Sequence, residues 1–141
     1  MKPFKKTVYL AGAISYFYNI NQPLRATVWR EKAEQYFEEL DIKCFNPCKE
    51  SPRCWEYPQE GLINQNYFYL KNCDIILVNL DMINDSVGTI WELSMAWKEH
   101  KPIVAFGKTH WLERPHMRSL ISVKFNTLHE ALDYITDMYE I

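Results

Sequence analysis

Short apolar runs separated by helix-like segments are the feature that most limits how this chain can fold. Runs at Thr7–Ala11, Ile42–Phe45, Ile75–Leu80 and Ile103–Phe106 have the length and composition of buried strands. Parallel strands need helical crossovers of this kind between them. The alternation therefore predicts an α/β fold: one doubly wound parallel sheet, Rossmann-like or flavodoxin-like, flanked by helices in three layers.

Boundary residues predict where several helices begin. Pro23 suits the first turn of a helix that continues to Leu40, after a loop over Tyr16–Pro23. A closing helix is predicted from Thr127, which together with Glu130 three residues later forms a capping box.

The segments between these helices complete the predicted order of elements. A further helix is expected around Ile63–Leu70, and a short strand at Val123–Phe125. The stretch Pro47–Gly61 is irregular, and a loop of that length is either a functional lid or plain surface cover.

Length and charge bound the function classes. With 141 residues we expect a single domain over 1–141, and a net charge of −2 gives no reason to propose a nucleic acid polymer or an anionic membrane as partner. The basic and apolar start resembles a secretory signal, but it fits a first buried strand better, since no small-residue cleavage site follows. No run approaches the ~20 apolar residues of a membrane span. A cytoplasmic protein is expected.

The cysteines and nucleotide motifs point to no cofactor. Cys44, Cys48, Cys54 and Cys73 form no C-x-x-C pair, and the histidines lie far from them in the sequence. Free intracellular thiols are favoured over a metal site, with Cys73 at the edge of the core. Neither a G-x-G-x-x-G after the first strand nor a P-loop occurs.

The segment from Asp85 to Glu92 is the strongest candidate for chemistry. It predicts a polar loop containing Gly88, followed by a helix with Glu92 in its first turn, where the helix dipole favours an ionised carboxylate. Such a residue either offsets the dipole or acts as a nucleophile. The surrounding strand–loop–helix–strand order favours a site, because ligands of open α/β sheets lie beyond the carboxyl ends of the strands.

Other candidate binding residues follow from topology and residue type. Asn79 closes a strand on the side where ligands bind. Arg25, at the start of a helix, and Arg30 both suit a phosphate, and for Arg30 a solvated charge on the helix face is the favoured alternative. Aromatic side chains available to stack on a base are Tyr16, Phe17 and Trp55.

Four pieces of sequence, taken in order, resemble one family. They are Tyr9-Leu10-Ala11-Gly12, Asn46-Pro47, the run from Asn72 to Leu80, and the run from Gly88 to Ala96 followed by Lys101-Pro102-Ile103-Val104. Together they resemble the nucleoside 2-deoxyribosyltransferase family, which includes nucleoside 5′-monophosphate N-glycoside hydrolases. The most specific piece is the Gly-Thr-x-x-Glu motif.

The resemblance implies roles for particular residues. Glu92 would attack the anomeric carbon of a deoxyribose and hold it as a covalent ester, as a retaining glycosyl transfer requires. Tyr9 would position this nucleophile, the alternative being a plain aromatic residue at the edge of a strand. Gly12, Gly88 and Thr89 belong to the matching motifs and would contact the substrate.

The chain departs from the transferase pattern at two places. Asn66 stands where the transferases have an aspartate that handles the base, and an amide cannot exchange a carboxyl proton. Asp85-Ser86 stands where they have an aspartate that holds the sugar. Ser86 is similar to the hydrolases, in which a serine suits a 5′-phosphate that an aspartate would repel.

Two further positions match the family pattern less specifically. Ser119 falls near a second phosphate-binding serine of the hydrolases, although Gly12-Ala13-Ile14-Ser15 replaces their Gly-Ser-Ile-Arg. Asp74 matches an aspartate of the family pattern, and it either caps the start of a strand or supports the pocket.

These observations favour an enzyme that cleaves the N-glycosidic bond of a 2′-deoxynucleoside through Glu92 and transfers the sugar to another base. A 2′-deoxynucleoside 5′-monophosphate hydrolase is the alternative within the family. A non-catalytic nucleotide-binding domain is the alternative outside it, motivated by Asn66. The resemblance also implies a homo-oligomer with shared active sites, a nucleoside or nucleotide and a free nucleobase as ligands, and no cofactor.

Overall fold

A five-stranded parallel sheet forms the centre of the protein, for which a computed structural model describes residues 6–49 and 56–139. The strand order is β2-β1-β3-β4-β5, which is the flavodoxin-type arrangement and confirms the predicted fold class. The strands are β1 (Thr7–Ala11), β2 (Lys43–Phe45), β3 (Ile75–Asn79), β4 (Ile103–Phe106) and β5 (Val123–Phe125).

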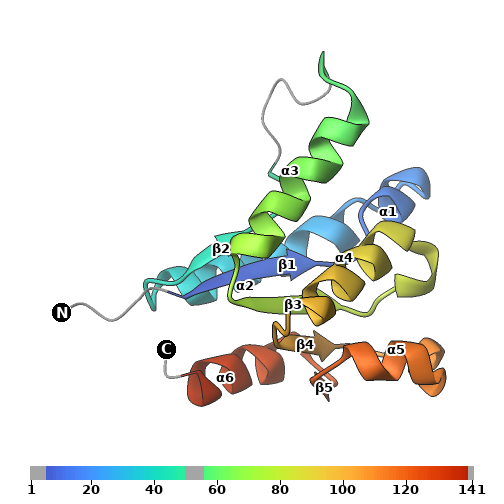
Figure 1. The fold of residues 1–141 in the computed structure, drawn as a ribbon. Helices are drawn as coiled ribbons and strands as arrows, with labels where there is room; N and C mark the ends of the chain where they lie inside the picture. Colours follow the sequence, from blue (N-terminus) through green and yellow to red (C-terminus); the bar gives the residue numbers. More distant parts are fainter. Residues whose placement is uncertain (1–5, 50–55, 140–141) are drawn as a thin grey trace.

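Helices cover both faces of the sheet (Figure 1). They are α1 (Ser15–Asn19), α2 (Leu24–Glu38), α3 (Gln59–Asn72), α4 (Val87–Lys98), α5 (Pro115–Leu120) and α6 (Leu128–Met138), with short 3₁₀ turns η2 (Ile83–Asp85) and η3 (His110–Glu113). Packing places α2 and α6 on one face and α3, α4 and α5 on the other. Within the described ranges, none of these helices has the length and apolar character needed to cross a bilayer.

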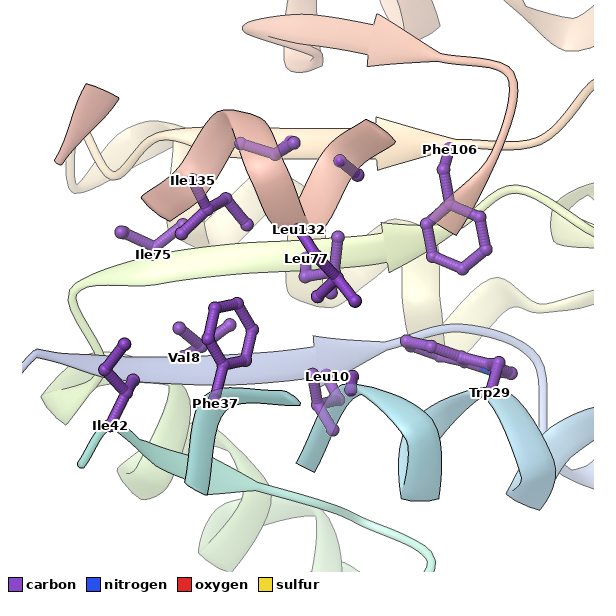
Figure 2. Close-up of a cluster of buried hydrophobic side chains, with 13 residues drawn as sticks. Val8, Leu10, Trp29, Phe37, Ile42, Ile75, Leu77, Phe106, Leu132 and Ile135 are labelled. Atoms are coloured by element: carbon purple, nitrogen blue, oxygen red, sulfur yellow. The ribbon is translucent and has the colours of Figure 1, made fainter. Parts of the chain in front are cut away.

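Alternate side chains of the central strands build the first core layer, which Figure 2 shows. Val8, Leu10, Ile75 and Leu77 point toward α2 and α6, since successive strand residues face opposite sides of a sheet. Phe37 of α2 packs among them, fully buried. Each such side chain contributes about 1.5–3 kcal/mol through burial.

The intervening strand residues build the second layer. Tyr9, Ala11, Ile76 and Val78 face the opposite side, where residues of the other three helices bury them. Leu70 of α3, Leu93 and Ala96 of α4, and Met117 of α5 complete this layer. The β3 strand is therefore buried on both faces, as its unbroken apolar sequence requires.

Two predicted segments differ in structure or extent from the observed ones, and a predicted helix cap is confirmed. The expected loop Tyr16–Pro23 contains the short helix α1, because Phe17 is drawn into a small apolar cluster with Ala13 and Ala26. Helix α3 begins at Gln59, four residues before the predicted start, so the irregular segment is shorter than expected. The capping box of Thr127 with Glu130 at the start of α6 is confirmed.

The order of the strands reverses between β1 and β3, the two central neighbours. From β1 the chain goes to β2 on one side, and from β3 it goes to β4 and β5 on the other. Crossover connections diverge at such a switch point and leave a crevice beyond the carboxyl ends of the strands. A functional site is therefore expected beyond Ala11 and Asn79, the last residues of β1 and β3.

Candidate active site

A tyrosine and a glutamate meet between β1 and α4. The hydroxyl of Tyr9 donates a hydrogen bond to Oε2 of Glu92. Tyr9 is fully buried, and its ring stacks on Phe45 with centroids 5.1 Å apart. Phe45 stacks in turn on Tyr69 of α3 at 4.2 Å. This stack leaves the phenol one orientation, which fixes the carboxylate that it binds.

Glu92 does not lie in the first turn of its helix, contrary to the expectation from sequence. Helix α4 begins at Val87, so Glu92 lies in the second turn and no acidic residue occupies the first. Gly88 is part of the helix and not of the preceding loop. The free N–H groups of the helix start are therefore not what governs the carboxylate, because their influence fades within one turn.

Burial governs the charge of Glu92 instead. Removal from water raises the pKa of Glu92 to about 7, although the hydrogen bond from Tyr9 and the positive charge of Arg30 both act to lower it. Burial also raises the pKa of Tyr9 far above its ordinary value, so the tyrosine stays protonated and remains a donor. A carboxyl that titrates near neutral pH is typical of catalytic groups.

Arg30 is buried, and the prediction that it is a solvated charge on the helix face was wrong. Its guanidinium is fully buried, donates from Nε to the carbonyl of Leu10 at 3.3 Å, and donates from Nη2 to the carbonyl of Gly12 at 3.0 Å. It also lies 4.6 Å from the centre of the Trp29 ring. The spacing of Ala26, Arg30, Ala33 and Phe37 along one helix stripe is the signal that could have revealed this burial.

The turn after β1 approaches the end of β3 closely. Gly12 has a φ of +157°, and a Cβ there would lie 3.2 Å from the Trp29 side chain and 3.4 Å from Cβ of Asn79. Asn79 is itself nearly buried, and its Oδ1 accepts a hydrogen bond from the amide of Asp81 at 2.9 Å. Glycine is required at this turn by its conformation and by the lack of space.

Residues 5–109 match the model of a family described as nucleoside 2-deoxyribosyltransferase like. The chain belongs to this family.

Solved structures agree with the nucleoside 2-deoxyribosyltransferase-like fold. A 2-deoxyribosyltransferase from Bacillus psychrosaccharolyticus is 23% identical, with a TM-score of 0.67 over 91% of each chain. A conserved protein from Enterococcus faecalis V583 is 15% identical, with a TM-score of 0.68 over 96% of this chain and 99% of that one.

A third similar structure is a CMP N-glycosidase, BcmB, from Clostridium botulinum. It is 22% identical, with a TM-score of 0.52 over 95% of this chain and 100% of that one. None of the curated protein sequences compared with this chain matches it.

The family motif Gly-Thr-x-x-Glu occupies the first two turns of α4. Ser86 is the N-cap: its Oγ accepts from the Thr89 amide at 3.4 Å and lies 2.6 Å from Thr89 Oγ1. A Cβ on Gly88 would meet nothing within 4 Å, so the space beside it is open. Asp85 is exposed and accepts from the Asn84 amide group at 3.2 Å. The start of α4 thus presents small polar groups beside free space.

Arg25 lies beside the crevice but already has partners. Its guanidinium binds both carboxylate oxygens of Asp81, at 2.9 and 3.1 Å, and the amide oxygen of Gln22 at 2.7 Å. It also lies 4.6 Å above the ring of Phe17. A phosphate at Arg25 would have to compete with Asp81 for the same donors.

Asn66 lies on α3, one turn before the buried Leu70 and therefore on the helix face toward the sheet. Helix α3 also packs against α4, where the ring of Tyr67 lies 5.8 Å from that of Trp91, the residue before Glu92. The side of α3 that carries Asn66 thus borders the helix that carries the nucleophile candidate.

Asp74 lies away from the crevice, and Ser119 lies on α5. Oδ2 of Asp74 accepts from the Thr7 amide at 2.8 Å and from the Thr7 hydroxyl at 3.2 Å, at the amino end of β1. Of the two roles considered for Asp74, this contact corresponds to the strand cap. It lies at the end of the sheet opposite the crevice. Ser119 is exposed on α5, and its hydroxyl donates to the His116 carbonyl at 2.7 Å.

The predicted aromatic and cysteine residues lie in different surroundings. Phe17 is buried in the core, Tyr16 is half-buried with its ring 5.7 Å from that of Phe17, and Trp55 lies outside the described residues. Cys44 and Cys73 are free thiols, Cys73 being buried as expected, and Cys48 Sγ donates to the carbonyl of Ala26 at 3.8 Å. Cys54 lies outside the described residues. Across residues 6–49 and 56–139, no three metal-binding side chains come together.

An open, basic hollow of about 700 Å³ lies beyond the carboxyl ends of β4 and β5. Its charged and titratable lining residues are Lys108, His110, Glu113, Arg118 and Lys124. Helix α5, which carries Arg118 and Ser119, packs against α4. No sequence pattern marks this hollow, because its residues come from separate segments between residues 108 and 124.

Proposed function

We propose that this protein transfers 2-deoxyribose between nucleobases through a covalent ester on Glu92. One observation carries the proposal: in a chain of the nucleoside 2-deoxyribosyltransferase-like family, the motif glutamate is partly buried and held by the hydroxyl of a fully buried tyrosine. A fixed carboxylate aimed at one reacting atom gains from orientation, and its burial removes competing water.

The proposed reaction has two displacements at the anomeric carbon. Glu92, as the carboxylate, forms a bond to this carbon while the N-glycosidic bond breaks and its electron pair leaves with the base. A nitrogen of a second base then attacks the same carbon, the ester bond breaks, and Glu92 is released as a carboxylate. The proton of the attacking nitrogen passes through solvent to the base that left. Tyr9 holds the unreacted oxygen of Glu92 through both steps, and Asn66 is proposed to hydrogen-bond the base edge.

A hydrolase of 2′-deoxynucleoside 5′-monophosphates is the second candidate, and one observation favours it. Lys108, Arg118 and Lys124 place three positive charges in the hollow beyond β4 and β5, in a protein whose net charge is −2. Ser86 at the start of α4 offers a hydroxyl to the same class of anion. In this candidate, water takes the place of the second base.

We also propose, on the family resemblance, that the protein assembles as a homo-oligomer whose neighbours share active sites. Exposed apolar side chains on α3, including Ile63 and Phe68, would be buried in such a contact. Light scattering of the purified protein tests this, and a monomer at assay concentration would contradict it.

The deciding experiment is chromatography of reactions with 2′-deoxynucleosides and their 5′-monophosphates, each with and without a second free base. A new nucleoside that forms only with the acceptor base supports the transferase. Free base released from the monophosphates alone supports the hydrolase.

Glu92→Gln is the matched variant for this experiment, because it keeps the shape of the side chain and removes its charge. We expect it to lower either activity by at least about a thousandfold. Full activity of Glu92→Gln would contradict the covalent mechanism. No Glu92-dependent release from any substrate would contradict both candidates.

A further inference from the structure

Arg30 is the one charged side chain that is fully buried among residues 6–49 and 56–139. A guanidinium away from water is costly unless its donors are satisfied. Its guanidinium donates to three main-chain carbonyls: Leu10 near the end of β1 at 3.3 Å, Gly12 in the turn after β1 at 3.0 Å, and Ala26 of its own helix at 2.5 Å. No carboxylate forms an ion pair with Arg30 in the described part of the chain.

Two of the carbonyls that Arg30 binds, those of Leu10 and Gly12, lie in and just beyond the end of β1, the strand that carries Tyr9. Leu10 directly follows Tyr9, and Tyr9 donates to Glu92. Arg30 comes from α2 on one face of the sheet, and Glu92 comes from α4 on the other. The end of β1 is therefore held by Arg30 on one face of the sheet, and its Tyr9 binds the Glu92 carboxylate on the other face.

We propose that Arg30 is a positioning residue for the proposed reaction, holding the end of β1 in place and supplying the positive charge that keeps Glu92 available as an anion. The inference rests on the proposed function only for its catalytic consequence. The effect of the Arg30 charge on Glu92 is a property of the protein without substrate. Tyr9 and Arg30 are both fully buried, so water screens the charge of Arg30 poorly. The field of this charge therefore acts on groups beyond those that Arg30 contacts directly.

Other charges around α4 are less well placed to do this. On the pKa of Glu92, the groups that act besides burial are Tyr9 and Arg30. The titratable groups on the elements packed against α4 are Glu60, Tyr67, Tyr69 and Lys71 of α3, Asp85 of η2, and His116 and Arg118 of α5. Lys98 stands at the far end of α4 itself.

The test measures the titration of Glu92 directly, without substrate. The carboxyl signal of ¹³C-labelled glutamate is followed against pH in the wild type, with Glu92→Gln to assign the signal. Arg30→Gln removes the charge but keeps an amide donor, Arg30→Lys keeps the charge but loses the planar fork, and Lys32→Gln removes an exposed charge from the same helix.

We expect the pKa of Glu92 to rise by about one pH unit in Arg30→Gln and to stay near the wild-type value in the other two variants. If the protein is active, kcat/KM at pH 6 then falls about tenfold more in Arg30→Gln than kcat/KM at pH 9, since the anionic fraction falls tenfold for each pH unit. An unchanged Glu92 titration in Arg30→Gln, or an equal rise in Arg30→Lys, would overturn the proposal. Absence of activity in the wild type would contradict the proposed function alone.

Loss of the fold in Arg30→Gln is addressed by a second variant. If the Glu92 carboxylate depends on the Arg30 charge, Arg30→Gln costs less stability at pH 8 when Glu92 is already Gln than it does in the wild type. Urea unfolding measures all four proteins. Equal destabilisation in both backgrounds, including failure of both variants to fold, would assign Arg30 a purely structural role and overturn the proposal.

Discussion

Glu92 is subject to two opposing influences at the scale of a single side chain. Burial strengthens its interaction with any cationic transition state, because fewer water molecules screen the charge. The same burial raises the pKa of Glu92 to about 7 and makes the anion scarcer at neutral pH. The hydroxyl of Tyr9 offsets part of this cost by donating to the charged form.

Replacing Tyr9 by Phe should therefore make the enzyme more sensitive to acid. Loss of the donated hydrogen bond raises the pKa of Glu92, and we expect the acid limb of kcat/KM to move to higher pH, with a loss of about tenfold or more at pH 6. The ring contact with Phe45 remains, so the variant should fold.

The matched control for this prediction is Tyr67→Phe. Tyr67 loses a hydroxyl whose acceptor is Glu99, at 3.3 Å, and not Glu92. An acid limb that moves equally in both variants, or in neither, would contradict the positioning role of Tyr9.

The sequence identified some of these residues and missed another for physical reasons. Tyr9 and Glu92 stand in motifs that the family resemblance marks, and the structure brings them into contact. Arg30 was misjudged because a charged residue on a helix is usually solvated. Only its place in the stripe of Ala26, Ala33 and Phe37 argues otherwise, and that argument requires a partner for the guanidinium that no sequence pattern reveals.

At the scale of an element, the start of α4 combines two tasks. Ser86 caps the helix by accepting from the amide of Thr89, and it also stands beside the open space next to Gly88. The helix start was predicted too late because Gly88 is typical of a loop. Asp85 and Ser86 are both good N-cap residues, and the sequence alone does not decide between a cap at Ser86 and a later one.

Substitution of Ser86 can separate these two tasks. Ser86→Ala removes the cap, and we expect it to lower the free energy of unfolding by about 1 kcal/mol. Ser86→Asp keeps a good cap and adds a negative charge. The Asp variant should therefore be nearly as stable as the wild type, while its kcat/KM for 5′-monophosphates falls more than that for nucleosides.

The substrate comparison uses both classes on the same preparation, with unfolding followed in urea. An equal fall in kcat/KM for nucleosides and monophosphates in Ser86→Asp would contradict a phosphate at this position.

At the scale of the whole molecule, the titration of Glu92 links activity to stability. The carboxyl has a pKa of about 7 in the folded protein, against an ordinary value of 4.5. A carboxyl with a raised pKa binds its proton more tightly in the folded state than in the unfolded state. The folded protein therefore loses stability as pH rises from about 4.5 to about 7.

We expect Glu92 to lower the free energy of unfolding by up to about 3 kcal/mol across this pH range. The measurement is urea unfolding of wild type and Glu92→Gln at several pH values between 4.5 and 8. The difference between the two proteins isolates Glu92, because the other titrating groups are common to both. A difference that does not vary with pH would show that burial does not raise the pKa of Glu92.

The overall architecture was more predictable than the site. Every central strand is a short apolar run, and the parallel sheet with flanking helices follows from their alternation with helices. Short helices such as α1 were missed, because one buried side chain, Phe17, is enough to order them and leaves no periodic pattern. The crevice residues come from distant segments, and their contacts depend on the strand order.

The strand order also determines when the sheet can assemble. Val8 of β1 pairs with Ile75 of β3, so the central pairing joins segments separated by most of the first half of the chain. During synthesis on a ribosome, β1 and α2 emerge long before β3, and until then one edge of β1 has no partner strand. Such non-local pairing slows folding. The nascent chain therefore exposes Tyr9 and the apolar side of α2 for several seconds at ribosomal rates of about 5–20 residues per second. During this period a chaperone has access to the strand that carries Tyr9.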